Sequence, residues 1–419
     1  MTSTSTRSAA RERATAGGLV LFLLGVSFFA SALKELRPTV AGLSVHPYVF
    51  VLLLGLVVFV SQRGLKAHGL FGGAGVALIA AIAISELVNG TLVAALPSLV
   101  KWATIALTLI VTSNLVANGR DFRLGAVGMI LGVSLIAARG LVVYQSQPSY
   151  YLNVMDGIGS RNVFSLWTLA PVAYCVWFLM AKRQTGLREK LFALGSLLLM
   201  AVPQVLSLSR AGWIMLVATV VLVAAMKRSA RFVPVALVLG LSVQWAVDEY
   251  GFGARLQDRF EELQTGTGSD AKRTKIIEAA PEILLDNPLF GVSQTRLPLE
   301  LARRLYLSRP IASHNFLVEM AAGTGVVGLL ALIACAVALF RQWERGRRAR
   351  NDDTREFAGL IVVLMALIVL RGMTANEVIY NPSIAMGLGL VVGLLRAGRT
   401  DETAPVAATR ATSWRLARA

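Results

Sequence analysis

The chain has 419 residues, of which 55% are hydrophobic, with a mean hydropathy of +0.64 and a formal net charge of +17. This composition excludes an ordinary soluble domain, because apolar runs long enough to cross about 30 Å of hydrocarbon recur along most of the chain. The positive charge does not indicate nucleic-acid binding, since most Lys and Arg residues lie in connections between apolar runs, where they orient a membrane protein. We therefore expect membrane lipids, and no nucleic acid, among its partners.

The apolar runs predict an all-α integral membrane protein with about twelve transmembrane helices. The first run lacks a signal-peptide cleavage site and is interpreted as a span. The positive-inside rule places both termini in the cytoplasm. We expect nine spans in residues 1–248, a helical periplasmic segment at 249–314, three spans in 315–396 and a disordered cytoplasmic tail at 397–419. The predicted spans are 17–33, 44–61, 69–88, 95–113, 122–143, 161–181, 190–208, 210–227, 231–248, 315–340, 357–372 and 379–396.

The predicted outer loop at residues 144–160 contains Tyr150, Tyr151 and Asp156. Aromatic rings and small polar groups suit sugar faces and hydroxyls, and they equally suit a membrane interface. These three residues are thus candidate contacts to a glycan or an acceptor. Arg161 opens the next predicted span and either holds a phosphate or anchors the helix end.

The sequence SLSRAGW leaves almost no loop between two spans, so Arg210 is held at the outer membrane edge. One interpretation is that its side chain extends to the lipid headgroups. The other is that it binds an anionic ligand, which the small neighbours Ser209 and Gly212 favour because they allow close packing.

The outer segment contains an amphipathic pattern over residues 269–288 that predicts a helix ended by Asn287 and Pro288. Arg273 lies near its start, where a positive charge is unfavourable to the helix dipole. A phosphate bound there gains from both the dipole and the guanidinium group, whereas the alternative is a solvated cationic face. The expected apolar stripe consists of Ile276, Ile277, Ala280, Ile283 and Leu284.

The end of the outer segment contains a second predicted helix, LPLELARRLYL, and a histidine. We expect the helix, with Arg303 and Arg304, to lie on the membrane surface rather than in a site. His314 precedes Asn315 at the mouth of a span, beside the cationic segment. Its ordinary pKa allows proton transfer near neutral pH, so it is a candidate for catalysis or for orienting a substrate.

Neither cofactor nor metal is expected. Cys175 and Cys335 both lie inside apolar runs and are interpreted as buried thiols. The predicted outer side lacks the clustered carboxylates that a metal-clamped diphosphate needs. Arginine side chains can neutralise a diphosphate without a metal ion.

The order of these features resembles the bacterial O-antigen ligase and O-antigen polymerase superfamily. The resemblance in topology covers most of the chain. It is most specific over residues 205–330, which contain SLSRAGW, NPLFG and SHNFLVEMAAGTGVVG. It implies a helical, GT-C-like glycosyltransferase that works without metal at the periplasmic face of the bacterial inner membrane.

The resemblance also implies substrates and residue roles. The donor is a glycan on undecaprenyl diphosphate. The acceptor is a sugar hydroxyl of lipid A–core in a ligase, or a second lipid-linked repeat in a polymerase. Arg210 and Arg273 match arginines that contact the diphosphate, His314 matches the essential histidine, and Arg161 is a further candidate diphosphate contact.

We favour an O-antigen ligase of lipopolysaccharide biosynthesis that inverts the anomeric carbon in a single displacement. The alternative within the same site is an O-antigen or exopolysaccharide polymerase. A transporter or flippase of anionic lipid or polysaccharide is disfavoured, because the sequence has no detected internal repeat and its charges cluster at one face.

Overall fold

The computed structural model describes residues 3–33, 36–40, 43–63, 69–146, 161–181, 186–207, 209–228, 232–249, 269–375 and 377–403. Helices account for nearly all of this part of the chain. The described strands are β1 (Thr39–Val40) and β2 (Leu43–Ser44), which form one short antiparallel pair. The predicted helical class is thus confirmed, with this small pair as an addition that the sequence did not suggest.

A helix covers every predicted span. By length and composition, five helices are apolar enough to cross a membrane, and shorter apolar helices lie in five other elements of the described chain. The last helix continues to Thr403, beyond the predicted end of its span. The helices over the spans are α1 (Ser3–Ala32), α2 (Pro47–Arg63), α3 (Gly69–Val88), α4 (Leu92–Leu115), α5 (Gly119–Ser146), α7 (Arg161–Met180), α8 (Leu187–Leu206), α9 (Arg210–Lys227), α10 (Phe232–Glu249), α14 (Phe316–Arg347), α15 (Asp352–Gly372) and α16 (Pro382–Thr403).

Helix α7 passes through the middle of the bundle. In its segment Val163–Met180, 89% of the residues are buried, because α5, α8, α9, α15 and α16 pack around it. The Tyr174 hydroxyl donates a hydrogen bond of 2.6 Å to the Gly387 carbonyl oxygen of α16. A helix that is apolar on all sides and buried on all sides belongs to the interior of a membrane bundle. Its first turn therefore lies at the centre of one end of the bundle.

Glycines bring α1 and α5 into close contact. A side chain at Gly128 would clash with the backbone of Phe22, and one at Gly132 with the carbonyl group of Gly25. Gly128 and Gly132 are four residues apart and so lie on one face of α5. This is the small-residue packing by which membrane helices approach closely.

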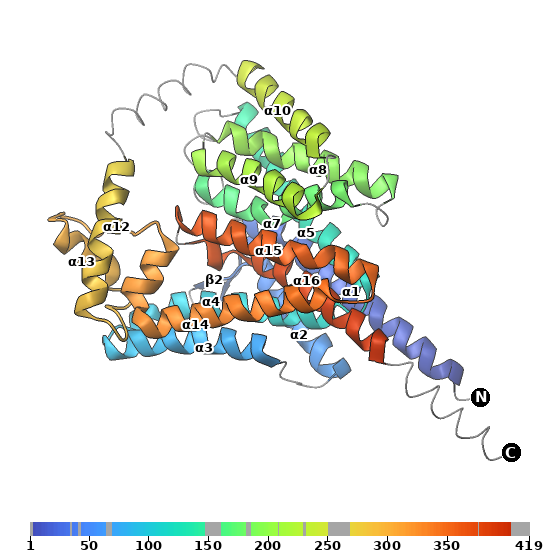
Figure 1. Cartoon of the computed structure of the whole chain (residues 1–419), viewed down its shortest axis with the longest axis horizontal. Coiled ribbons are helices and arrows are strands. Elements are labelled where there is room, and N and C mark those ends of the chain that lie inside the picture. The colour runs from blue at the N-terminus through green and yellow to red at the C-terminus, as the bar shows by residue number, and fades with distance from the viewer. Residues whose placement is uncertain are drawn as a thin grey trace, which may run out of the picture.

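The two ends of the bundle differ. Figure 1 shows α12 (Ser269–Asp286) and α13 (Leu297–Arg304) at one end, whereas α1 begins and α16 ends at the other. We call the end that carries α12 and α13 the capped end. Helices α12 and α13 therefore lie at the opposite end of the bundle from the start of α1 and the end of α16, and the membrane side that each end faces stays a prediction.

Helices α12 and α13 form a small core with the start of α14. This core contains Ile276, Ile283, Leu297, Leu301 and Val318. The predicted helix of the outer segment is confirmed, but its buried face is turned slightly from the expected stripe. Ile277 is 50% exposed, and the buried positions are Ile276, Ala279, Ala280 and Ile283.

Helix α14 is kinked at Gly325, where the backbone φ is 67°. The chain that follows α12 fits into this kink. The amide of Val326 donates to the Pro288 carbonyl oxygen at 2.8 Å, and the amide of Val292 donates to that of Ala322 at 3.0 Å. The inserted segment Pro288–Val292 thus satisfies backbone groups that the kink removes from the helix, as a broken membrane helix requires.

Helix α3 supports the inserted segment from the other side. The Ser85 hydroxyl lies 2.6 Å from the Phe290 carbonyl oxygen and 2.9 Å from that of Gly323. The side-chain amide of Asn89 donates to the Gly291 carbonyl oxygen at 3.1 Å. Polar side chains at the end of an apolar helix therefore fix the position of the inserted segment Pro288–Val292, which follows α12 and contacts α14.

Candidate active site

His314 is held in an unusual backbone conformation at the start of α14. Its φ is 47°, in the left-handed region that few residues other than glycine, asparagine and aspartate adopt readily. The next residue, Asn315, caps α14: its Oδ1 accepts hydrogen bonds from the amides of Leu317 at 2.9 Å and Val318 at 3.2 Å. The side chain of His314 is exposed, whereas Ser313 and Asn315 are buried. The turn therefore presents the imidazole while its neighbours anchor the backbone.

Arg273 lies at the same end of the α12–α14 pair as His314. The last turn of α12 leads to the kink at Gly325, and Ile276 in its second turn packs in one core with Val318. The two helices thus run side by side in the same direction, with both of their first turns at the capped end. Arg273 precedes Ile276 by about one turn and is half-buried.

Arg371, near the end of α15, is an arginine that the sequence analysis did not single out. It is 0% exposed. Its guanidinium group donates hydrogen bonds to the hydroxyls of Thr374 at 2.5 Å and Ser165 at 3.2 Å. Ser165 lies one turn into α7 from Arg161, so the guanidinium lies one helical turn deeper than the level of Arg161.

Contacts connect Arg371 to the turn of His314. A side chain at Gly372, the residue after Arg371, would lie 3.4 Å from Cβ of Phe316. Phe316 is the first residue of α14 and is separated from His314 by Asn315 alone. The end of α15 therefore connects the first turns of α7 to the start of α14.

The first turn of α9 joins the same cluster. Ser209 caps α9, accepting a hydrogen bond of 3.2 Å from the Gly212 amide. A side chain at Gly212 would lie 3.4 Å from Cβ of Ser165, so α9 approaches α7 closely. Buried Gln204 of α8 connects α7 and α9. Its side-chain oxygen accepts a hydrogen bond of 2.7 Å from the Thr168 hydroxyl, and its side-chain nitrogen donates to the Gly212 carbonyl oxygen. These small residues therefore pack the helices together, and the predicted ligand role of Arg210 stays a prediction.

The structure thus gathers most of the predicted site residues at the capped end. Arg161 and Arg210 are the first residues of α7 and α9, two helices in contact through Ser165. Their side chains lie outside what the structure describes. The predicted glycan or acceptor contacts Tyr150, Tyr151 and Asp156 also lie outside the described residues.

Arg304 has a structural role, because its guanidinium group is paired with carboxylates of the protein. Its guanidinium contacts Glu282 at 3.0 Å, Glu300 at 3.4 Å and Asp286. The hydrogen bond with Asp286 is the largest of the contributions that raise its pKa. Arg303 is exposed and pairs with Glu300 at 3.0 Å. Arg304 therefore fastens α13 to α12.

A signal for Arg371 was present in the sequence. The run VLMALIVLRGMT places an arginine at the end of an apolar span. Ionisable residues inside membrane spans usually face the interior of the bundle and mark functional sites. Its burial depends on Ser165 and Phe316, which belong to two other helices, and so the sequence could not place it.

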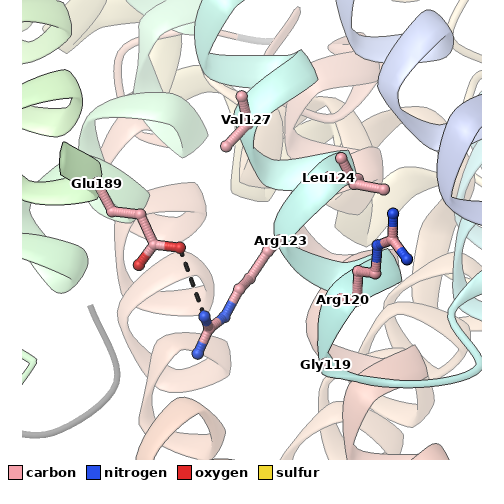
Figure 2. A pocket seen from close by; sticks show the side chains of 6 residues that line it. All are labelled: Gly119, Arg120, Arg123, Leu124, Val127 and Glu189. Atoms are coloured by element: carbon pink, nitrogen blue, oxygen red, sulfur yellow. Dashed lines mark hydrogen bonds and ion pairs between the residues drawn. The ribbon is translucent and has the colours of Figure 1, made fainter. Parts of the chain in front are cut away.

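One cavity of the described structure lies away from this cluster. It has a volume of about 490 Å³ and is lined by residues at the starts of α5 and α8, at the end opposite the capped end. Figure 2 shows Arg123 directed toward Glu189 within it. Within the described ranges, no three His, Cys, Asp or Glu side chains are grouped to hold a metal ion.

Residues 195–333 match the O-antigen ligase family model. The comparison with curated proteins gives no match. The matched region contains α9, α12, α13 and the start of α14, and so includes Arg210, Arg273 and His314. The predicted resemblance is confirmed over this region.

The O-antigen ligase match supports the wider superfamily of ligases and polymerases. It supports a glycosyltransferase-like enzyme in a membrane, acting on lipid-linked glycans in the general manner of that family. Arg371 lies outside the matched region, and so does Arg161. The hydrogen bond from Arg371 to Ser165 connects α15 to the first turns of α7, which Arg161 begins.

Proposed function

We propose that this protein is an O-antigen ligase of the bacterial inner membrane. It transfers a glycan from undecaprenyl diphosphate to a sugar hydroxyl of lipid A–core at the periplasmic face. The observation that supports the proposal is that the matched segment places Arg210, Arg273 and His314 at one end of the bundle, the end at which Arg371 is buried.

The chemistry follows from charge and proton transfer. The acceptor hydroxyl attacks the anomeric carbon, the bond from that carbon to the diphosphate oxygen breaks, and undecaprenyl diphosphate leaves with the bonding electrons. Arg210 and Arg273 stabilise the negative charge that develops on the diphosphate. His314 accepts the proton of the acceptor hydroxyl or orients that hydroxyl. A single displacement inverts the configuration at the anomeric carbon.

Arg371 adds a fixed positive charge beneath the diphosphate site. A charge at this depth is costly to bury, so we assign it a functional purpose. The hydrogen bonds to Ser165 and Thr374 hold its guanidinium between α7 and α15. We place it as a positioning residue, because it sets the spacing of these helices and raises the positive potential where Arg161 lies.

The test uses purified protein in lipid bilayers with a glycan on undecaprenyl diphosphate as donor. Two acceptors are compared, lipid A–core and a second lipid-linked repeat. Transfer to lipid A–core with inverted anomeric configuration is the expected result. Transfer that occurs only onto the second repeat replaces the ligase by a polymerase, and a retained configuration contradicts the single displacement.

The two arginines of α12 and α13 provide a matched comparison. Arg273→Ala is expected to lower the rate of transfer about a hundredfold. A preorganised hydrogen-bond donor that faces a developing negative charge contributes about 3 kcal/mol to the stability of the transition state. Arg304→Ala removes the same charge nearby but affects mainly the attachment of α13, because its partners are carboxylates of the protein. Initial rates at equal amounts of folded protein make the comparison. Equal losses in both variants contradict a diphosphate role for Arg273.

Arg371→Gln is expected to raise KM for the donor about tenfold, equivalent to about 1.4 kcal/mol. Arg371→Lys keeps the charge and is expected to retain more donor affinity. Ser165→Ala removes one hydrogen-bond partner without removing charge, and serves as the control. A purely structural role predicts a lower melting temperature in all three variants with an unchanged KM for the donor.

Transfer is expected to continue in excess EDTA, because arginine side chains supply the positive charge at the proposed diphosphate site. The rate is measured before and after exhaustive chelation. Loss of activity that magnesium or manganese restores contradicts metal independence. The result does not depend on the choice between ligase and polymerase, because both use the same donor.

A further inference from the structure

The cavity at the end opposite the capped end has the chemistry of a lipid-headgroup site. It lies between the first turns of α5 and α8 and is lined by Arg120, Arg123, Glu189, Gly119, Leu124 and Val127. None of these residues belongs to the cluster around His314. Their arrangement along the helix axis is the feature that indicates a ligand.

The lining is graded from charged to apolar along α5. Arg120 and Arg123 occupy the first two turns, and Leu124 and Val127 follow toward the interior of the apolar helix Gly119–Ser146. An anionic phospholipid has the same gradation, from a phosphate at the membrane edge to acyl chains below. Basic pockets between membrane helices bind such headgroups.

The positive charge of the cavity comes from arginine side chains that a ligand can reach. Arg123 pairs with Glu189 at 3.4 Å, and both side chains are more than one third exposed, at 39% and 37%. An exposed pair of this kind contributes little to stability, so a phosphate can compete for the guanidinium. Arg120 also lines the cavity and is exposed, and Figure 2 shows its side chain directed away from the Arg123–Glu189 pair. Arg123 is therefore the direct ligand that the cavity offers to a phosphate, and Arg120 adds positive charge at its rim.

The start of α5 does not itself supply the anion site. The amides of Arg120 and Asp121 already donate to Oδ1 of Asn118, at 2.8 and 3.0 Å. A phosphate in the cavity therefore interacts with arginine side chains and not with the helix end. Gly119 has no side chain and leaves space beside these arginines.

We propose that this cavity binds the phosphate of an anionic phospholipid, with Arg123 as its ligand, Arg120 as a second positive charge at the rim, and Leu124 and Val127 against the upper acyl chain. Glu189 competes with the lipid for Arg123. The proposal is independent of the transfer reaction, since it involves neither donor nor acceptor.

The test measures binding of phosphatidylglycerol to the full-length protein in detergent, by native mass spectrometry across a lipid titration. Arg120→Gln with Arg123→Gln is expected to weaken binding about 25-fold, about fivefold for each arginine. The matched control is Arg347→Gln with Arg348→Gln, two arginines paired with Glu344 at the end of α14, on the same side of the bundle. The control is expected to bind as the wild type does.

Glu189→Gln separates a lipid site from a structural ion pair. A lipid site predicts tighter binding, because the change frees Arg123 and removes a negative charge. Phosphatidylcholine and inorganic phosphate are the remaining probes, and neither is expected to displace phosphatidylglycerol at equal concentration. Unchanged binding in the Arg120 and Arg123 variant, an equal loss in the control, or displacement by inorganic phosphate overturns the proposal. A failure of glycan transfer leaves this result unaffected.

Discussion

Replacing His314 by asparagine is expected to lower glycan transfer by about 10²–10⁴-fold, the usual contribution of a general base. Asparagine suits this position because it tolerates the left-handed backbone that His314 adopts, with its φ of 47°. The change therefore removes the imidazole without disturbing the Asn315 cap. Donor binding and the melting temperature are expected to stay close to those of the wild type.

Two further substitutions support the interpretation. His314→Ala removes the same ring but strains the backbone. If this variant transfers more slowly than His314→Asn, the difference is the contribution of the turn conformation to the rate. His46→Asn is the control, because His46 lies before α2 and its ring contacts the Ser31 carbonyl oxygen at 3.3 Å. It is expected to transfer normally. A wild-type rate in His314→Asn assigns the histidine a structural role and removes it from the mechanism.

Gly325→Ala is expected to destabilise the fold by more than about 2 kcal/mol and to abolish transfer. Its φ of 67° disfavours any side chain, and the new Cβ would lie 2.7 Å from the Gly291 amide nitrogen and clash with the Leu289 carbonyl. The segment Pro288–Val292 must then leave the kink of α14. Because this segment positions α12, we expect Arg273 to lose its place relative to His314.

Gly195→Ala is the matched control for Gly325→Ala. Gly195 also lies within a membrane helix, and an added Cβ meets no atom within 4 Å. Alanine favours a helix over glycine by about 0.5–1 kcal/mol, so this variant is expected to be as stable as the wild type or slightly more stable. Melting temperatures in detergent and transfer rates decide between the outcomes. Equal behaviour of the two variants shows that the kink does not depend on glycine.

Much of the helical architecture was predictable because membrane helices leave a strong signal in a sequence. Each apolar run became a helix, and the amphipathic pattern that Asn287 and Pro288 end predicted α12 correctly. The buried face of α12 was predicted less well. Ile277 is exposed, whereas Ala279 is buried. The surface of α14 against which α12 packs decides which face of α12 is buried, and hydrophobicity alone does not decide it.

The candidate residues could be named from the sequence, but their arrangement could not. Arg210 and His314 stood out beside apolar spans and Arg273 near the start of an amphipathic helix, and their roles stay predictions. The burial of Arg371 required contacts from other helices. The kink at Gly325 was also beyond prediction. Its sequence, GTGVVG, is compatible with a continuous helix, and only the insertion of Pro288–Val292 explains the break.

The contacts of α3 have a consequence for how the protein is made. Ser85 and Asn89 pair with Phe290 and Gly291, about two hundred positions later in the chain. Buried Glu86 likewise accepts from the amide of Thr295 at 3.1 Å. At about 5–20 residues per second, a ribosome needs about 10–40 s to reach those partners after α3 has been synthesised. During that interval Glu86 has Thr91 and Asn89 has the Ser85 carbonyl oxygen as partners, but the partners of α3 in the second half of the chain do not yet exist. The position of α3 is therefore completed only when the second half of the protein arrives.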